Sequence, residues 1–167
     1  RFPQARERIR GGIVPHHLLA SELIAEIFSR ADRDTVRVIL IGPNHYEMGN
    51  AAFITSRFDW VTPVGAVLAD GTAIDTLRAQ SNTIAAEEDA IKSEHSVSGI
   101  MPFIAHYTPH ARVVPIIVSM KADIAMLEQL AESIAPLVDR GTIVIASVDF
   151  SHYLVAEKSA QMNVETR

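Results

Sequence analysis

Short runs of β-branched and apolar residues, each ended by a chain breaker, constrain the fold of this chain most. The clearest run covers residues 36–41 and ends at Gly42-Pro43-Asn44. Similar runs cover 11–14, 113–118 and 142–146, the second of them interrupted by Pro115. A run that is apolar on both faces is typical of a strand buried between two layers, as in a parallel sheet.

Segments with helical spacing alternate with these runs. They cover residues 18–30, 70–80, 96–107 and 122–138, and Asp70 is a candidate N-cap. Residues 51–56 are a further candidate strand. Residues 51–67 are expected to add an antiparallel section, with residues 60–65 extended or turning because Pro63 does not fit a central strand. The pattern predicts an α/β fold: a single-domain layered sandwich with a mostly parallel, mixed β-sheet flanked by helices.

Length and composition exclude several classes of function. A chain of 167 residues is the size of one ordinary domain, expected to cover residues 1–167. The net charge of −5 argues against a general affinity for nucleic acid or for anionic membranes. The chain has no cysteine, which excludes disulfides, thiolate metal ligands and cysteine nucleophiles within it. Nucleotide-phosphate loops, the G-x-S-x-G elbow and H-E-x-x-H are also absent from the sequence.

The sequence carries no targeting signal. No apolar run approaches the ~20 residues of a membrane span, and residues 1–8 lack the apolar core of a signal peptide. A cytoplasmic location is therefore expected. Because the chain does not begin with Met, we expect it to be a trimmed or partly covered polypeptide.

Imidazole and carboxylate groups follow three of the predicted strands. The groups lie in Pro15-His16-His17, in Pro43-Asn44-His45-Tyr46 and in residues 148–153, which include Asp149 and His152. In open α/β sheets, ligands bind outside the carboxyl ends of the strands, so these groups are expected to share one crevice. A fourth group, Glu94-His95-Ser96, lies at the start of a candidate helix.

These residue types permit three kinds of chemistry. Two histidines and one carboxylate with open positions are the ligand set of non-haem Fe(II) oxygenases. A zinc hydrolase uses the same types with a water in the fourth position. The same groups could also act as metal-free acids and bases, with Asp149 orienting a histidine.

Each residue also has a purely structural interpretation. Asp149 could cap a turn, and Glu94 could belong to a solvated acidic face. At most one of His16 and His17 is expected to point into a site. Two further histidines, His106 and His110, are expected to be ordinary surface residues. The joint placement of the groups at strand ends favours a functional site.

Five motifs, in order, resemble those of the Memo family, called AmmeMemoRadiSam system protein B in bacteria and archaea. They are Val14-Pro15-His16, Ile41-Gly42-Pro43-Asn44-His45, Trp60-Val61-Thr62-Pro63-Val64-Gly65, Glu94-His95-Ser96 and Asp149-Phe150-Ser151-His152. Each motif is short, but five in the family's order are specific. The resemblance extends from about Gly12 to Tyr153.

The resemblance implies a fold like that of the class III extradiol dioxygenases, which hold non-haem Fe(II) with two histidines and a glutamate. It implies that His16 and His45 bind a divalent transition metal, expected to be Fe(II), with copper or zinc as alternatives. Asp149 is the candidate third ligand in this chain. His95, Asp149 and His152 match further pocket residues and are expected to be catalytic acid–base or supporting groups.

The resemblance therefore favours a metal-dependent oxidoreductase, dioxygenase-like, that oxidises a small molecule. The alternative is a non-catalytic module that binds a peptide or a partner protein in the same crevice, and a zinc-type hydrolase is a third possibility. The family name implies partner proteins of a radical SAM system.

Three features depart from the family pattern. The third ligand of the better-known eukaryotic members is a cysteine in the C-terminal part, and we expect this chain to lack that C-terminal region. Ser98 and Ile100 stand where the family usually has an acidic and a polar residue. One wall of the pocket is therefore expected to be less polar than in the family. Tyr46 replaces a frequent second histidine.

Overall fold

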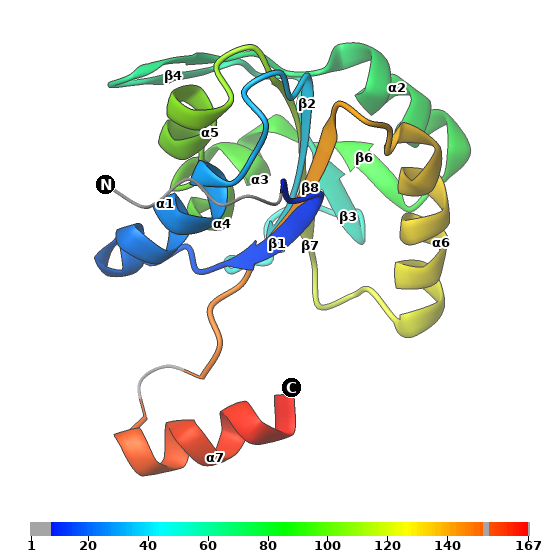
Figure 1. The fold of residues 1–167 in the computed structure, drawn as a ribbon. Coiled ribbons are helices and arrows are strands. Elements are labelled where there is room, and N and C mark those ends of the chain that lie inside the picture. Colours follow the sequence, from blue (N-terminus) through cyan, green and yellow to red (C-terminus); the bar gives the residue numbers. More distant parts are fainter. Residues whose placement is uncertain (1–7, 152–153, 167) are drawn as a thin grey trace.

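A six-stranded sheet forms the centre of the molecule in the computed structural model, which describes residues 8–151 and 154–166 (Figure 1). Its strand order is β1-β8-β2-β7-β3-β6. The strands are β1 (Gly11–Val14), β8 (Thr142–Ser147), β2 (Arg37–Pro43), β7 (Arg112–Val118), β3 (Phe53–Thr55) and β6 (Ile84–Ala86). The strands at 11–14, 36–41, 51–56, 113–118 and 142–146 that the sequence predicts are all present, and β6 is an addition.

The sheet is mixed, as predicted. Strands β1, β8, β2 and β7 are parallel to one another, with Leu40 of β2 level with Ile145 of β8 and Pro115 of β7. Strand β3 runs antiparallel to β7, and β6 runs parallel to β3. Residues 60–65 are extended as expected and belong to a separate antiparallel hairpin of β4 (Trp60–Thr62) and β5 (Gly65–Val67).

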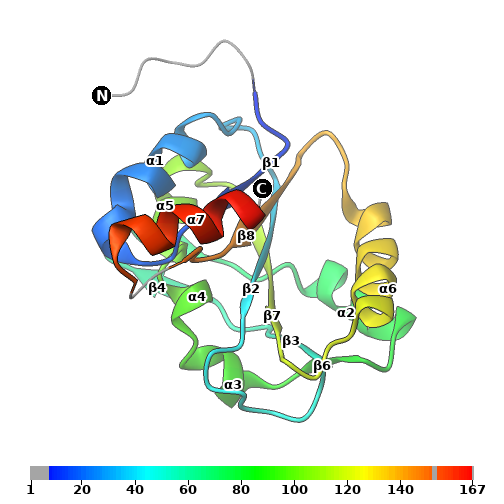
Figure 2. The ribbon, with the colours of Figure 1, turned by 90° about the horizontal axis from the view of Figure 1, so that it is seen from below.

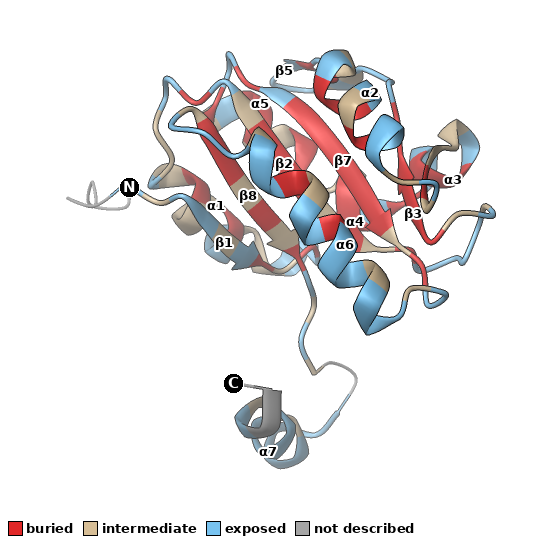
Figure 3. Cartoon of the chain, turned by 90° about the vertical axis from the view of Figure 1, so that its right-hand side faces the viewer, coloured by how far each residue is buried: buried red, intermediate tan, exposed pale blue. Residues whose placement is uncertain are grey.

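Helices cover both faces of the sheet, which confirms the layered α/β sandwich (Figures 2 and 3). Alternate residues of β2 point to opposite faces: Val38 and Leu40 join one buried apolar cluster and Ile39 the other. The first cluster includes side chains of α1 (Ser21–Ser29), α3 (Glu88–Lys92), α4 (His95–Ser98) and α5 (Met101–Tyr107). The second includes side chains of α2 (Gly71–Gln80) and α6 (Ile124–Ile134). Strands buried on both faces explain the continuous apolar runs.

Three predicted helices are shorter than the sequence pattern indicates or are divided. The segment 96–107 is not one helix, because α4 ends at Ser98 and α5 begins at Met101, with Pro102 in the first turn of α5. Proline is tolerated there because a first-turn N–H has no helical partner. A 3-10 turn, Leu18–Ala20, precedes α1, and another, Ala135–Leu137, follows α6. The side chain of Asp70 caps α2 as predicted.

Pro115 does not interrupt β7, contrary to the expectation from its missing N–H. The backbone N–H groups of Val113 and Ser119 donate to Leu68 and Ala52, on the β3 side of the strand. Successive backbone groups alternate in direction along a strand, so the nitrogen of Pro115 faces the same side. Pairing with β3 begins only at Ile116, so no ladder bond is lost there.

Helix α7 (Ala156–Thr166), which the sequence pattern does not indicate, follows the sheet and lies apart from the sandwich (Figures 1 and 3). Across the part of the chain that the structure describes, none of the helices has both the length and the apolar character needed to cross a membrane.

Candidate metal centre

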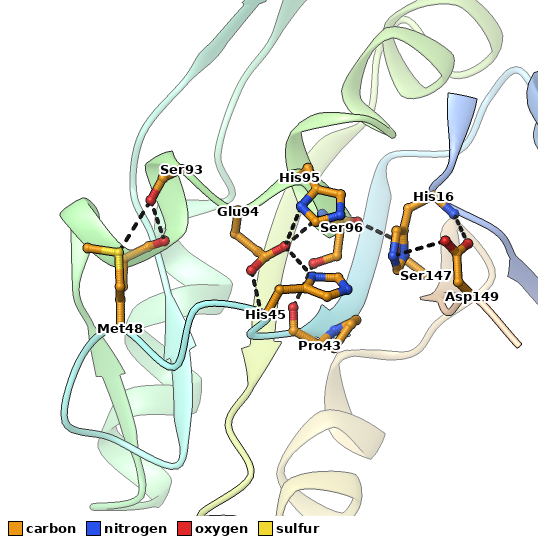
Figure 4. Close-up of polar contacts among 11 residues, drawn as sticks. His16, Pro43, His45, Met48, Ser93, Glu94, His95, Ser96, Ser147 and Asp149 are labelled. Carbon is orange, nitrogen blue, oxygen red and sulfur yellow. Dashed lines mark hydrogen bonds and ion pairs between the residues drawn. The ribbon is translucent and has the colours of Figure 1, made fainter. Parts of the chain in front are cut away.

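The ends of three neighbouring strands bring distant segments of the chain together (Figure 4). Strands β1, β8 and β2 are adjacent and parallel, so their carboxyl ends lie at one edge of the sheet. His16, Asp149 and His45 each follow one of these strands by two residues. Helix α4 begins at this edge with His95. The structure therefore brings His16, His45, His95 and Asp149 together at the edge where the sequence predicts a shared crevice.

Three imidazoles converge at this edge. The ring centroids of His45 and His95 are 4.3 Å apart and nearly parallel, and the ring of His16 stands edge-on to them at 4.9 and 5.2 Å. One ring nitrogen of each histidine lies within 4.8 Å of the other two. His16 is buried, and the other two are exposed. Imidazole is the commonest protein ligand for transition metals, so this group could hold an ion.

Hydrogen bonds fix the tautomer of His16. The hydroxyl of Ser147 donates its one proton to the carbonyl of Ser96 at 2.6 Å. At 3.2 Å from His16 Nδ1, that hydroxyl oxygen can therefore only accept, so Nδ1 carries the ring proton. In a neutral imidazole, Nε2 is then left with a free lone pair, the form that binds a metal.

Asp149 lies against the free nitrogen of His16. Its Oδ1 accepts a hydrogen bond from the backbone N–H of His16 at 3.0 Å, and its Oδ2 is 3.5 Å from His16 Nε2. Two lone pairs that face each other repel unless a proton or a cation lies between them. The contact therefore favours a positive charge beside Nε2. Asp149 is not a member of the three-imidazole group, and its role as a ligand stays a prediction.

A buried carboxylate fixes the second histidine. Glu94 is fully buried; its Oε1 is 2.8 Å from His45 Nδ1, and its Oε2 accepts the backbone N–H of His45 at 2.8 Å. Oε1 also accepts the backbone N–H of Ser96 at 2.9 Å, which caps α4. His45 Nδ1 is thereby the donor to a carboxylate, and its Nε2 is free for a metal. Histidine ligands are typically held by a carboxylate in this way.

The charges of this site follow from burial and hydrogen bonding. Burial of Glu94 by itself raises its pKa, but the hydrogen bonds from Ser96 and His45 outweigh burial, so the pKa lies below its usual value. Burial also lowers the pKa of His16, and the nearby His45 and His95 lower it further, against the opposing effect of Asp149. At neutral pH the site therefore contains a charged Glu94 and a neutral His16.

Close backbone packing joins α4 to the strand ends. The Ser96 hydroxyl donates to the carbonyl of Pro43 at 2.8 Å, and its own carbonyl accepts from Ser147. A side-chain carbon on Gly42 would lie 2.6 Å from Ser96 Oγ, so only glycine permits this approach. Ser96 thus links α4, which carries His95, to the ends of β2 and β8, which precede His45 and Asp149.

Several expectations for individual residues need correction. Glu94 is not part of a solvated face; it is buried and holds His45. Ser98 does line a cavity beside the histidines, but Ile100 lies in the apolar core, so only one of the two substitutions affects that wall. His17 is exposed, caps the following 3-10 turn through Nδ1 and is not a member of the three-imidazole group, although it lines the adjoining cavity. The predicted acid–base residue His152 lies outside the described residues.

Sequence reasoning missed two supporting residues. The roles of Ser147 and Glu94 in orienting His16 and His45 depend on contacts across 131 and 49 residues of chain. The one local signal was the position of Glu94 just before a helix, where an acidic side chain is a good N-cap.

The metal-free chain is expected to lose stability in acid. Because folding lowers the pKa of His16, the unfolded chain takes up a proton near pH 6.5 that the folded chain resists. The free energy of unfolding should therefore fall as the pH drops below about 6.5. The lowered pKa of Glu94 adds a second loss below about pH 4.5.

Urea unfolding of the metal-free chain between pH 7.5 and 5.5 measures the loss of unfolding free energy that we attribute to His16. In the variant His16→Gln, the free energy of unfolding should depend less steeply on pH. The variant His106→Gln, at an exposed position, should keep the pH dependence of the original protein. Equal slopes in all three proteins would contradict this assignment.

Comparison with known proteins adds an independent observation. A family model described as "Memo-like protein" matches residues 1–165. A MEMO1 family protein of Pyrobaculum arsenaticum is 30% identical over 96% of this chain and 59% of its own length. A second, from Methanothermobacter thermautotrophicus, is 31% identical over 87% of this chain and 55% of its own length. The chain spans about half the length of the curated relatives it matches.

Proposed function

The chain belongs to the Memo family, and we propose that it is a metalloprotein in which His16, His45 and His95 bind one divalent transition-metal ion. One observation carries the proposal: imidazoles from three separate segments converge, with one nitrogen of each within 4.8 Å of the others. The hydrogen bonds to Ser147 and Glu94 support it, because they place the proton of a neutral ring on Nδ1 and so leave Nε2 of His16 and of His45 as the nitrogen that can bind a metal.

The donor set indicates which ions fit. Imidazole suits iron, copper, zinc and nickel, whereas magnesium and calcium prefer oxygen ligands. We favour Fe(II) because a carboxylate, Asp149, lies beside the histidines and could complete a histidine–carboxylate set with open positions. A redox-active ion bound there would supply electron transfer for the oxidation of a small molecule.

The surrounding residues would serve this chemistry in distinct ways. Ser147 and Glu94 hold the rings of His16 and His45 in the ligating tautomer. Asp149 Oδ2, which is partly exposed beside His16, could accept a proton from a substrate. The reaction class that we propose is the oxidation of a small molecule. The proposal concerns this chain, which spans about half the length of its curated relatives.

Elemental analysis tests the proposal. The chain should be purified anaerobically, without a metal-affinity column, and analysed for iron, copper, zinc and nickel. The expected result is about one iron per chain. One equivalent of copper or zinc would reject Fe(II) but retain the site, whereas no metal above background, even after incubation with Fe(II), would contradict the proposal.

A further inference from the structure

An open cavity of about 530 Å³ adjoins the three-imidazole group. His16 and His95 form one wall. Leu18 in the 3-10 turn before α1 and Pro102 at the start of α5 also line the cavity. A volume in this range holds a small molecule rather than a single water or ion.

The lining of this cavity is apolar and carries no formal charge apart from its histidines. Besides His16, His17 and His95, the described residues that line it are Leu18, Ser98, Gly99 and Pro102. Arginine and lysine, which bind carboxylates and phosphates, are absent from this set of described residues. The hydroxyl of Ser98 is the only uncharged polar side chain in the set. An anionic ligand would therefore find hydrogen-bond donors in Ser98 and His17 but no permanent positive charge in this lining.

A second cavity, of about 530 Å³, lies on the far side of His17 but serves the metal less well. Its lining includes Glu26 and Asp149 together with Ile13, Leu23 and Phe150, and none of the three clustered imidazoles. A ligand there would lie next to two carboxylates rather than next to the ring nitrogens. The cavity with His16 and His95 is therefore the better candidate for a ligand that reaches the ion.

We propose that the cavity lined by Leu18, Ser98 and Pro102 binds an uncharged small molecule with an apolar body and one metal-binding donor atom. The body would lie against Leu18 and Pro102, and the donor atom would bind the ion held by His16, His45 and His95. This inference rests on the proposed function and names the class of ligand. Binding of peptides through phosphate or carboxylate groups is disfavoured by the same lining.

Cobalt(II) and a matched pair of probes test this inference. The chain is loaded with Co(II), whose visible absorption reports its ligands, and is titrated at pH 7.5 with imidazole and with 4-phenylimidazole. Both probes present the same donor nitrogen, but only one carries an apolar body. Burial of the phenyl group should make 4-phenylimidazole bind about tenfold more tightly than imidazole.

Variants locate the binding site of the phenyl group. Ser98→Phe, which fills the cavity, should bring the ratio of the two affinities close to one. Leu18→Ala removes an exposed side chain at low risk to the fold and should reduce the ratio severalfold. Ser133→Phe, on α6 and outside the cavity lining, should keep the original ratio.

Three outcomes would overturn the inference. If Co(II) gives no protein-bound spectrum, the proposed function fails and the inference fails with it. If the cobalt spectrum forms but both probes bind equally, the metal site stands and the cavity does not bind the apolar body. If phenyl phosphate binds more tightly than 4-phenylimidazole, the site prefers anions.

Discussion

Replacing both His16 and His45 with alanine is expected to abolish metal binding while the sandwich stays folded. The two rings supply two of the three converging nitrogens, and a single imidazole does not retain an ion at micromolar protein concentration. The metal content should fall from about one equivalent to below about one tenth. The folded state should survive because Ser147 keeps its hydrogen bond to Ser96. Glu94 also still accepts hydrogen bonds from the backbone N–H groups of residues 45 and 96.

The matched control removes the same number of imidazoles elsewhere. His106 and His110 are exposed, as the sequence predicts, and lie outside the three-imidazole group. The variant His106→Ala/His110→Ala should keep its full metal content. Elemental analysis gives the stoichiometry, and circular dichroism and thermal unfolding check the fold. Equal metal content in both double variants would reject His16 and His45 as ligands.

Glu94→Gln is expected to weaken both the fold and the metal site. The carboxylate uses one oxygen for the backbone N–H of His45 and the other for the ring of His45 and the backbone N–H of Ser96. Glutamine has one acceptor oxygen and one NH₂ group, so at least one of these buried donors would face another donor. The expected loss of unfolding free energy is about 2–3 kcal/mol. The metal affinity should fall about 10- to 100-fold, because the ring of His45 loses its anchor.

Urea unfolding of the metal-free protein and a competitive chelator titration measure the two effects of Glu94→Gln separately. Glu132→Gln, at an exposed position on α6, is the matched control and should change the free energy of unfolding by less than about 0.5 kcal/mol. A Glu94→Gln protein with unchanged metal affinity would show that this carboxylate serves the fold alone.

The sequence predicts the strand ends better than it predicts the supporting contacts. Continuous apolar runs identify four parallel strands, of which β2, β7 and β8 are buried between layers, whereas β1 is an edge strand with Ile13 exposed. Parallel pairing then requires His16, His45 and Asp149 to share one edge. This reasoning needs only the pattern of apolar residues and the order of the motifs along the chain. It explains why the crevice is predictable before its geometry is known.

The arrangement behind the histidines was not predictable in this way. The capping side chain of Glu94 satisfies a local preference, but its second contact, with His45, depends on how α4 packs against the end of β2. The position of His95 in the imidazole group depends on the same packing, and the sequence suggested an acid–base or supporting role for it rather than a place among the metal ligands. Packing between distant segments leaves no periodic signal in one sequence.

The order of the strands also decides when the site can exist during synthesis. Strand β8 lies between β1 and β2, although it is the last strand to be made. Until residue 147 has left the ribosome, the segments that carry His16 and His45 lack the strand that separates them and the hydroxyl that orients His16. Because contacts of such long sequence separation form late, we expect ion loading to follow translation of nearly the whole sheet. An ion bound afterwards would hold together the three segments that carry His16, His45 and His95.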